Sequence, residues 1–146
     1  YFHKDTKGSS SIKKVLPAVL TSSPQLRKFY GQPDYGNPQV MPSLNYQNFV
    51  WCPTDATGQP PDPYELLRDL GAQLLGEEVR PGEDPDDLAI SEGGAAATAY
   101  ARLQFETLSP ESRQRLESAL LRYCELDTLA MVMVVQGWRE ALNHKP

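Results

Sequence analysis

Apolar residues recur at intervals of three and four positions in four segments of the chain, which is the spacing of one face of an α-helix. The pattern predicts helices over residues 10–20, 63–75, 94–107 and 110–142. The last segment has no Gly or Pro after its start except Gly137, and about 33 residues at 1.5 Å each would extend roughly 50 Å. We therefore expect a mainly helical chain with one long C-terminal helix.

The residues at the helix starts agree with these boundaries. A serine precedes the first predicted helix, and Ser109 is placed to cap the last one, with Pro110 in its first position. Pro17 lies inside the first predicted helix, where a proline removes a backbone hydrogen bond. That helix should therefore end or kink at Pro17.

Proline dominates the middle of the chain, because ten of the thirteen prolines fall between Pro24 and Pro85. We expect a loop-rich segment over residues 21–62, with a short extended piece at 48–51, and an acidic loop over residues 76–92. The first residue is Tyr1, so the chain is expected to be one partial domain, 1–146, excised from a longer protein.

The longest apolar run, residues 129–135, is far shorter than the ~18 residues that a membrane span needs. No membrane association is expected. Cys52 and Cys124 lie far apart without metal-ligand spacing. They are interpreted as reduced thiols, which places the protein in the cytoplasm.

The net charge of −5 is unevenly distributed. Residues 1–30 carry six basic residues against Asp5 alone, whereas residues 61–95 carry ten acidic residues against two arginines. The basic start could contact nucleic acid, although a solvated basic end explains it as well. The acidic segment would repel phosphates and should lie away from a nucleic-acid groove.

Two polar groups interrupt the apolar face of the last predicted helix. This face is formed by Leu116, Leu120, Tyr123, Asp127, Ala130, Val134 and Trp138. A buried or half-buried aspartate is costly unless it is paired. In a purely structural interpretation, the Tyr123 ring packs in the core, and Asp127 accepts a hydrogen bond from a neighbouring loop or pairs with an arginine.

The pair also fits a specific chemistry. Tyr123 and Asp127 resemble the Tyr-x-x-x-Asp motif on a late helix of DEDD-type 3′–5′ exonucleases, which have a ribonuclease-H-like fold. Three blocks extend the likeness: "GSSSIKKVLPAVL" (8–20), "LAISEGGAAATAYARL" (88–103) and "LLRYCELDTLAMV" (120–132). In this order they resemble a bacterial family of unknown function whose members carry an exonuclease-like domain.

The resemblance implies roles for individual residues. Asp127 would bind a catalytic Mg²⁺ or Mn²⁺, and the Tyr123 hydroxyl would orient the attacking water. Lys13 and Lys14, on the first predicted helix, would contact phosphates of the nucleic acid; their alternative is a solvated helix face. The implied fold is the C-terminal part of an α/β ribonuclease-H-like domain with its central sheet mostly missing.

The chain lacks other parts of such a site. No Asp-x-Glu occurs on a strand-like run, and the acids of residues 83–87 lie in a proline-containing loop. The remaining metal ligands are therefore expected before Tyr1. The fragment alone should be inactive and bind no metal, and the face left by the missing sheet could drive self-association.

The expected function is thus that of a C-terminal fragment of a metal-dependent 3′–5′ exonuclease-like protein acting on nucleic acid. The alternative is a non-catalytic binding or scaffolding module that retains the fold, which the net negative charge favours. No Ser-His-Asp, Cys-His or glycine-rich phosphate loop supports an enzyme complete within these residues. His3 and His144 lie at the two ends and are interpreted as non-catalytic.

Overall fold

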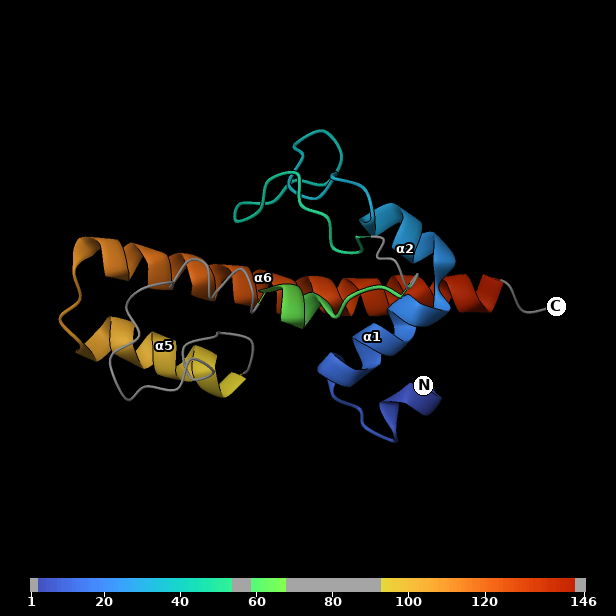
Figure 1. Ribbon diagram of the computed structural model, residues 1–146, viewed down its shortest axis with the longest axis horizontal. Helices are drawn as coiled ribbons and strands as arrows, with labels where there is room; N and C mark the ends of the chain where they lie inside the picture. The colour runs from blue at the N-terminus through green and yellow to red at the C-terminus, as the bar shows by residue number, and fades with distance from the viewer. Residues whose placement is uncertain (1–2, 54–58, 68–92, 144–146) are drawn as a thin grey trace. The chain divides into compact units, whose positions relative to one another are not determined.

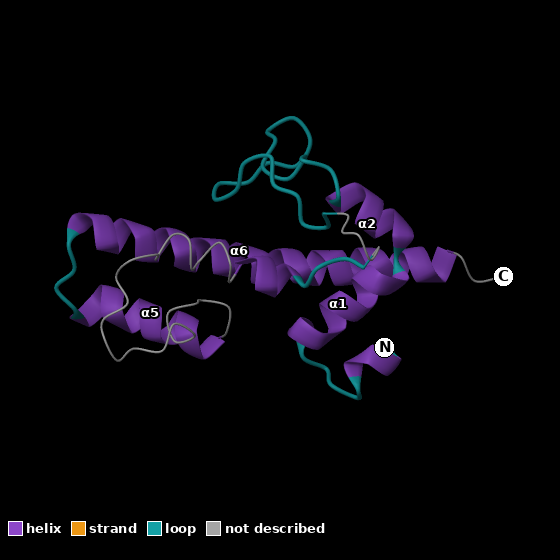
Figure 2. Ribbon diagram, viewed as in Figure 1, coloured by secondary structure: helices purple, strands orange, loops and turns teal. Residues whose placement is uncertain are grey.

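The computed structural model describes residues 3–53, 59–67 and 93–143 of the chain. Most of these residues are helical, and no strand occurs among them (Figure 2). The named elements are η1 (Lys4–Thr6), α1 (Ile12–Ser22), α2 (Pro24–Tyr30), α5 (Gly93–Phe105) and α6 (Pro110–Asn143). The prediction of a mainly helical chain is confirmed. Residues 63–67 are helical too, whereas the rest of the predicted helix 63–75 and the acidic loop 76–92 lie outside the described residues.

The chain divides into two compact units, which are described separately. Unit 1 contains residues 1–63 and 126–146, and unit 2 contains residues 64–125. The division falls within α6, so the N-terminal part of this helix belongs to unit 2 and its C-terminal part to unit 1.

α1 forms the first helix of unit 1 and begins after Ser11, whose backbone is extended as an N-cap requires. The helix was expected to end or kink at Pro17, and it does not end there, because α1 continues to Ser22. The hydroxyls of Thr21 and Ser22 donate to the carbonyls of Pro17 and Ala18, at 2.9 and 2.8 Å. The buried residues of α1 are Val15, Leu16, Ala18, Val19 and Leu20.

α2 lies inside the segment 21–62 that was predicted to be loop-rich. Pro24 occupies its first position, where the missing N–H costs nothing, and Leu26 and Tyr30 are buried. The Arg27 guanidinium donates to the carbonyl oxygen of Leu20 at 2.8 Å and to that of Thr21. It thereby satisfies carbonyls in the last turn of α1 and fixes the corner between the two helices.

An aromatic cluster organises the chain after α2. Its rings are Tyr35, Tyr46, Phe49 and Trp51, and the Phe49 and Trp51 centroids are 4.6 Å apart in an edge-to-face arrangement. Gly36 has φ 85°, and a side chain there would overlap the backbone of Tyr46. The extended piece expected at residues 48–51 is only an isolated bridge between Tyr35 and Phe49.

In unit 1 the C-terminal part of α6 lies beside α1 and α2 (Figure 1). The approach is close at Gly137, where an added Cβ would overlap Val19 Cγ1 and lie 2.9 Å from Ser23 Oγ. Two polar contacts flank this point. The Tyr30 hydroxyl donates to Gln136 Oε1 at 2.9 Å, and the Gln25 N–H donates to Glu140 Oε1 at 3.2 Å.

In unit 2, α5 and the first half of α6 contribute buried residues at helical spacing. These are Ala99, Leu103, Leu116, Ala119 and Tyr123. The predicted start of the last helix is confirmed, because Ser109 Oγ accepts the N–H of Ser112 at 3.1 Å and Pro110 is the first residue of α6. Exposed ion pairs at i, i+4 join Arg102 to Glu106 and Arg113 to Glu117.

The contact at Gly137 generates a first prediction. Gly137→Ala should lower the free energy of unfolding by about 1–3 kcal/mol, because overpacking against Val19 and Ser23 outweighs the better helix propensity of alanine. The matched control is Gly94→Ala in α5, where a Cβ meets nothing within 4 Å. The control should be neutral or stabilising by up to about 1 kcal/mol. Urea unfolding followed by circular dichroism would contradict the prediction if Gly137→Ala were stabilising.

A second prediction concerns alkaline pH. Burial raises the pKa of Tyr30 to about 12 and that of Cys52 to about 11, from ordinary values of 10.0 and 9.0. Above pH 9 the unfolded chain therefore loses protons that the folded chain retains, and the free energy of unfolding falls as the pH rises. Below pH 9 both groups are protonated in both states, so this part of the stability is fully present.

The test is urea unfolding of the wild type and of Cys52→Ala at a series of pH values from 8 to 11, the upper end being the folded pKa of Cys52. The decline above pH 9 should be shallower for Cys52→Ala. Cys124→Ala removes an exposed thiol and should keep the wild-type slope. Identical slopes for the wild type and Cys52→Ala would show that Cys52 does not contribute.

Candidate functional site

Asp127 occupies the border between the buried and exposed sides of α6. Its neighbour Leu126 and the residue one turn on, Ala130, are both fully buried, whereas Asp127 itself is half-buried. Asp127 takes part in at least one noncovalent interaction. Its location leaves part of its surface open to solvent, as a ligand for a metal ion would need.

Tyr123 lies one turn before Asp127 on the same continuous helix. Residues four apart on an α-helix project from the same side, so α6 gives the pair the spacing of the exonuclease motif. Only 5% of the Tyr123 surface is exposed, and this residue contributes to the buried part of unit 2. Such burial agrees with the structural interpretation in which the ring of Tyr123 packs in the core.

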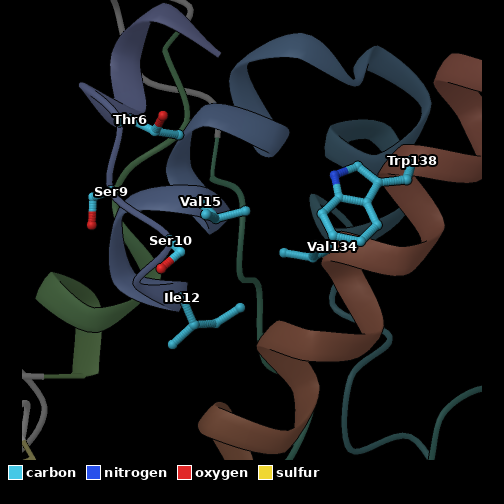
Figure 3. Close-up of a pocket in the computed structure, with 8 residues that line it drawn as sticks. Thr6, Ser9, Ser10, Ile12, Val15, Val134 and Trp138 are labelled. Atoms are coloured by element: carbon cyan, nitrogen blue, oxygen red, sulfur yellow. The ribbon is translucent and has the colours of Figure 1, made fainter. Parts of the chain in front are cut away.

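A pocket of about 250 Å³ lies in unit 1 between the segment η1–α1 and α6 (Figure 3). Ile12 and Val15 of α1 and Val134 and Trp138 of α6 give it apolar walls, and their side chains face one another across it. Its remaining lining residues are Thr6, Gly8, Ser9 and Ser10. The pocket therefore combines an apolar interior with hydroxyl groups along one side, which suits a small group with both polar and apolar surface.

The hydroxyl side of the pocket is ordered by local hydrogen bonds. Thr6 Oγ1 donates to the carbonyl of His3 at 2.8 Å, and Ser9 Oγ accepts the N–H of Ser11 at 3.2 Å. His3 Nε2 lies 2.9 Å from Ser22 Oγ, so η1 is tied to the far end of α1. His3 thus has a structural contact, and His144 lies outside the described residues.

Lys13 and Lys14 lie in the first turn of α1, next to the residues that line the pocket. Lys13 is half-buried and Lys14 is exposed. The backbone N–H groups at a helix start favour negative charge, and two lysines there add to this effect. On α6, Asp127 precedes Val134 by two turns, about 10 Å along the same side of the helix. Asp127 and the pocket residue Val134 therefore lie along one side of α6.

A metal site is not assembled within the described residues. No group of three or more His, Cys, Asp or Glu side chains gathers in residues 3–53, 59–67 and 93–143. Mg²⁺ is often held by only one or two carboxylates together with waters and substrate phosphates. A carboxylate such as that of Asp127 is the kind of group that binds Mg²⁺ or Mn²⁺, but one carboxylate alone does not make a metal site.

Sequence reasoning did not find the pocket. Its residues come from positions 6–15 and 134–138, which are more than a hundred positions apart in the chain. Among the lining residues, only the serines before α1 stand out in the local sequence, and the sequence pattern predicted only a helix cap there. Cys52 is buried and Cys124 is exposed, and neither forms a disulfide, as the sequence predicted.

No protein-family model matches the chain, and no match was found among curated proteins or solved structures. None of the helices in the described part of the chain combines the length and apolar character that crossing a bilayer requires.

Proposed function

We propose that this chain supplies the third-motif helix of a metal-dependent 3′–5′ exonuclease-like protein with a ribonuclease-H-like fold. The observation that carries the proposal is the location of Asp127. It is a half-buried carboxylate on a long continuous helix, with Tyr123 one turn before it, in a segment that resembles the exonuclease motif.

In this proposal Asp127 holds a divalent ion through its carboxylate, and the Tyr123 hydroxyl positions the attacking water. A bound pair of Mg²⁺ or Mn²⁺ ions would activate that water and stabilise the leaving oxygen of the phosphodiester. In this proposal the other carboxylates come from outside the described residues. Since the ring of Tyr123 is buried, only its hydroxyl would reach the reacting groups.

Lys13 and Lys14 contact the phosphates of the nucleic acid in this proposal. Their support is the basic N-terminal segment, the helix start at Ile12 and the adjacent hydroxyl-lined pocket. Lysines that contact phosphates contribute charge without reading the base sequence, so binding through them should weaken as the salt concentration rises.

The decisive prediction concerns Asp127→Asn in a longer protein that contains these residues. With Mn²⁺ and single-stranded DNA labelled at either end, the wild type should shorten the strand from its 3′ end. Asp127→Asn should reduce the rate by at least about 100-fold, because losing a metal ligand removes several kcal/mol of transition-state stabilisation and each 1.4 kcal/mol is tenfold. Tyr123→Phe should also slow the reaction, by about tenfold or more, because it removes only the hydroxyl.

The matched control is Glu117→Gln. Glu117 is an exposed carboxylate on the same helix, and its ion pair with Arg113 spans 3.9 Å at the surface. This variant should retain wild-type activity, and circular dichroism should show all three variants folded. Wild-type activity in Asp127→Asn would remove Asp127 from the mechanism. The isolated 146-residue chain should be inactive, and metal-dependent cleavage by it that survives Asp127→Asn would contradict the proposal as well.

The second candidate is a non-catalytic binding or scaffolding module. One observation favours it: the C-terminal part of α6 exposes large apolar side chains. The same assay separates the two functions. A folded wild-type protein that shows no metal-dependent cleavage of DNA or RNA under these conditions would support the binding module.

A further inference from the structure

The pocket between the segment η1–α1 and α6 has an uncharged lining. Within the described part of the chain, none of its eight lining residues carries a formal charge. Lys13 and Lys14 follow the lining residue Ile12 in the sequence, but they do not line the pocket. A charged molecule that entered would lose part of its hydration and gain no opposite charge in return, and such a transfer is costly. The lining therefore favours a neutral occupant.

The walls of the pocket suit an aromatic ring. Ile12 and Val15 of α1 face the α6 residues Val134 and Trp138 across it (Figure 3). The volume of about 250 Å³ exceeds the roughly 150 Å³ of an engineered apolar cavity that binds benzene. Water finds few hydrogen-bond partners on such walls, so its displacement by a ring is favourable.

One edge of the pocket offers both a hydrogen-bond acceptor and a donor. Thr6 is 3% exposed, and its Oγ1 donates to the carbonyl of His3 at 2.8 Å, which leaves the oxygen able to accept a further bond. Ser9 Oγ accepts the N–H of Ser11 at 3.2 Å, and this bond does not use the O–H of Ser9. A hydroxyl group both donates and accepts, so it matches this edge.

The framework of the pocket is fixed from two sides. His3 Nε2 lies 2.9 Å from Ser22 Oγ, and this contact ties η1 to the far end of α1. α6 approaches α1 closely at Gly137, where an added Cβ would overlap Val19. Because these contacts already hold the walls together, a ligand that binds would order few additional groups.

We propose that this pocket binds a neutral small molecule that carries an aromatic ring and one hydroxyl group. The ring lies between the apolar side chains of α1 and those of α6, and the hydroxyl group meets the edge formed by Thr6 and Ser9. The site is separate from Asp127, which does not line the pocket, and it does not depend on the proposed nuclease function.

The probe for this site is benzyl alcohol, added to the 146-residue chain while the signals of its two indole N–H groups are followed by nuclear magnetic resonance. The Trp138 signal should shift with a dissociation constant on the order of 1 mM, as expected for a ligand with so few atoms. Trp51 is an internal reference, because it is fully buried in the aromatic cluster and does not line the pocket. The Trp51 signal should stay in place.

Three molecules of similar size test the chemistry of the ligand. Benzoate and benzylammonium are charged, and each should bind at least about tenfold more weakly than benzyl alcohol. Toluene lacks the hydroxyl group and should bind more weakly by about threefold, because a typical hydrogen bond adds only a small net contribution.

Two variants locate the bound probe. Val134→Phe fills the pocket from α6 and should weaken the binding of benzyl alcohol by at least about tenfold. Its matched control is Val132→Phe, because Val132 lies on the same helix, is 44% exposed and does not line the pocket. Ser9→Ala removes an exposed hydroxyl group, so it decides the matter if circular dichroism shows that Val134→Phe is unfolded. It should weaken benzyl alcohol by about threefold and leave toluene unchanged.

Three results would overturn the proposal. The absence of a saturable shift at the Trp138 signal would show that the pocket holds only water. Equal affinity for benzyl alcohol and its charged analogues would show that the uncharged lining does not select the ligand. Wild-type binding by the folded Val134→Phe and Ser9→Ala variants would place the probe on a different surface.

Discussion

Unit 1 depends on the close approach of α6 to the corner between α1 and α2. Gly137 is the residue of α6 that allows this approach, because any larger side chain would overlap Val19 and crowd Ser23. Arg27 fixes the corner from the other side by donating to carbonyls in the last turn of α1. The pocket depends on the same packing, since its walls are α1 and the turn of α6 around Val134.

The hydrophobic pattern predicted the long elements well, for a physical reason. A helix such as α6 buries one side over many turns, so its periodicity is repeated often enough to be unmistakable. α2 has only seven residues, and the prolines around it favour turns, so its two buried residues could not establish a period. α1 continues past Pro17, where an end or a kink was expected, because tertiary burial of five of its residues outweighs the lost hydrogen bond.

The candidate site was predictable only in part. The positions of Tyr123 and Asp127 on one side of a helix follow from their spacing alone, and the structure agrees with that placement. Which of them is buried does not follow from spacing, because it depends on elements far away in the sequence. The pocket could not be predicted for the same reason: Thr6 and Trp138 become neighbours through packing that no local pattern records.

Burial differs around the circumference of α6. Leu126, Ala130 and Met133 lie on its buried side, whereas Met131 and Val135 are exposed. Asp127 lies on the boundary between the two. A carboxylate at the centre of the buried side would bear a large desolvation cost. At the boundary that cost is smaller, because part of the Asp127 surface remains open to solvent.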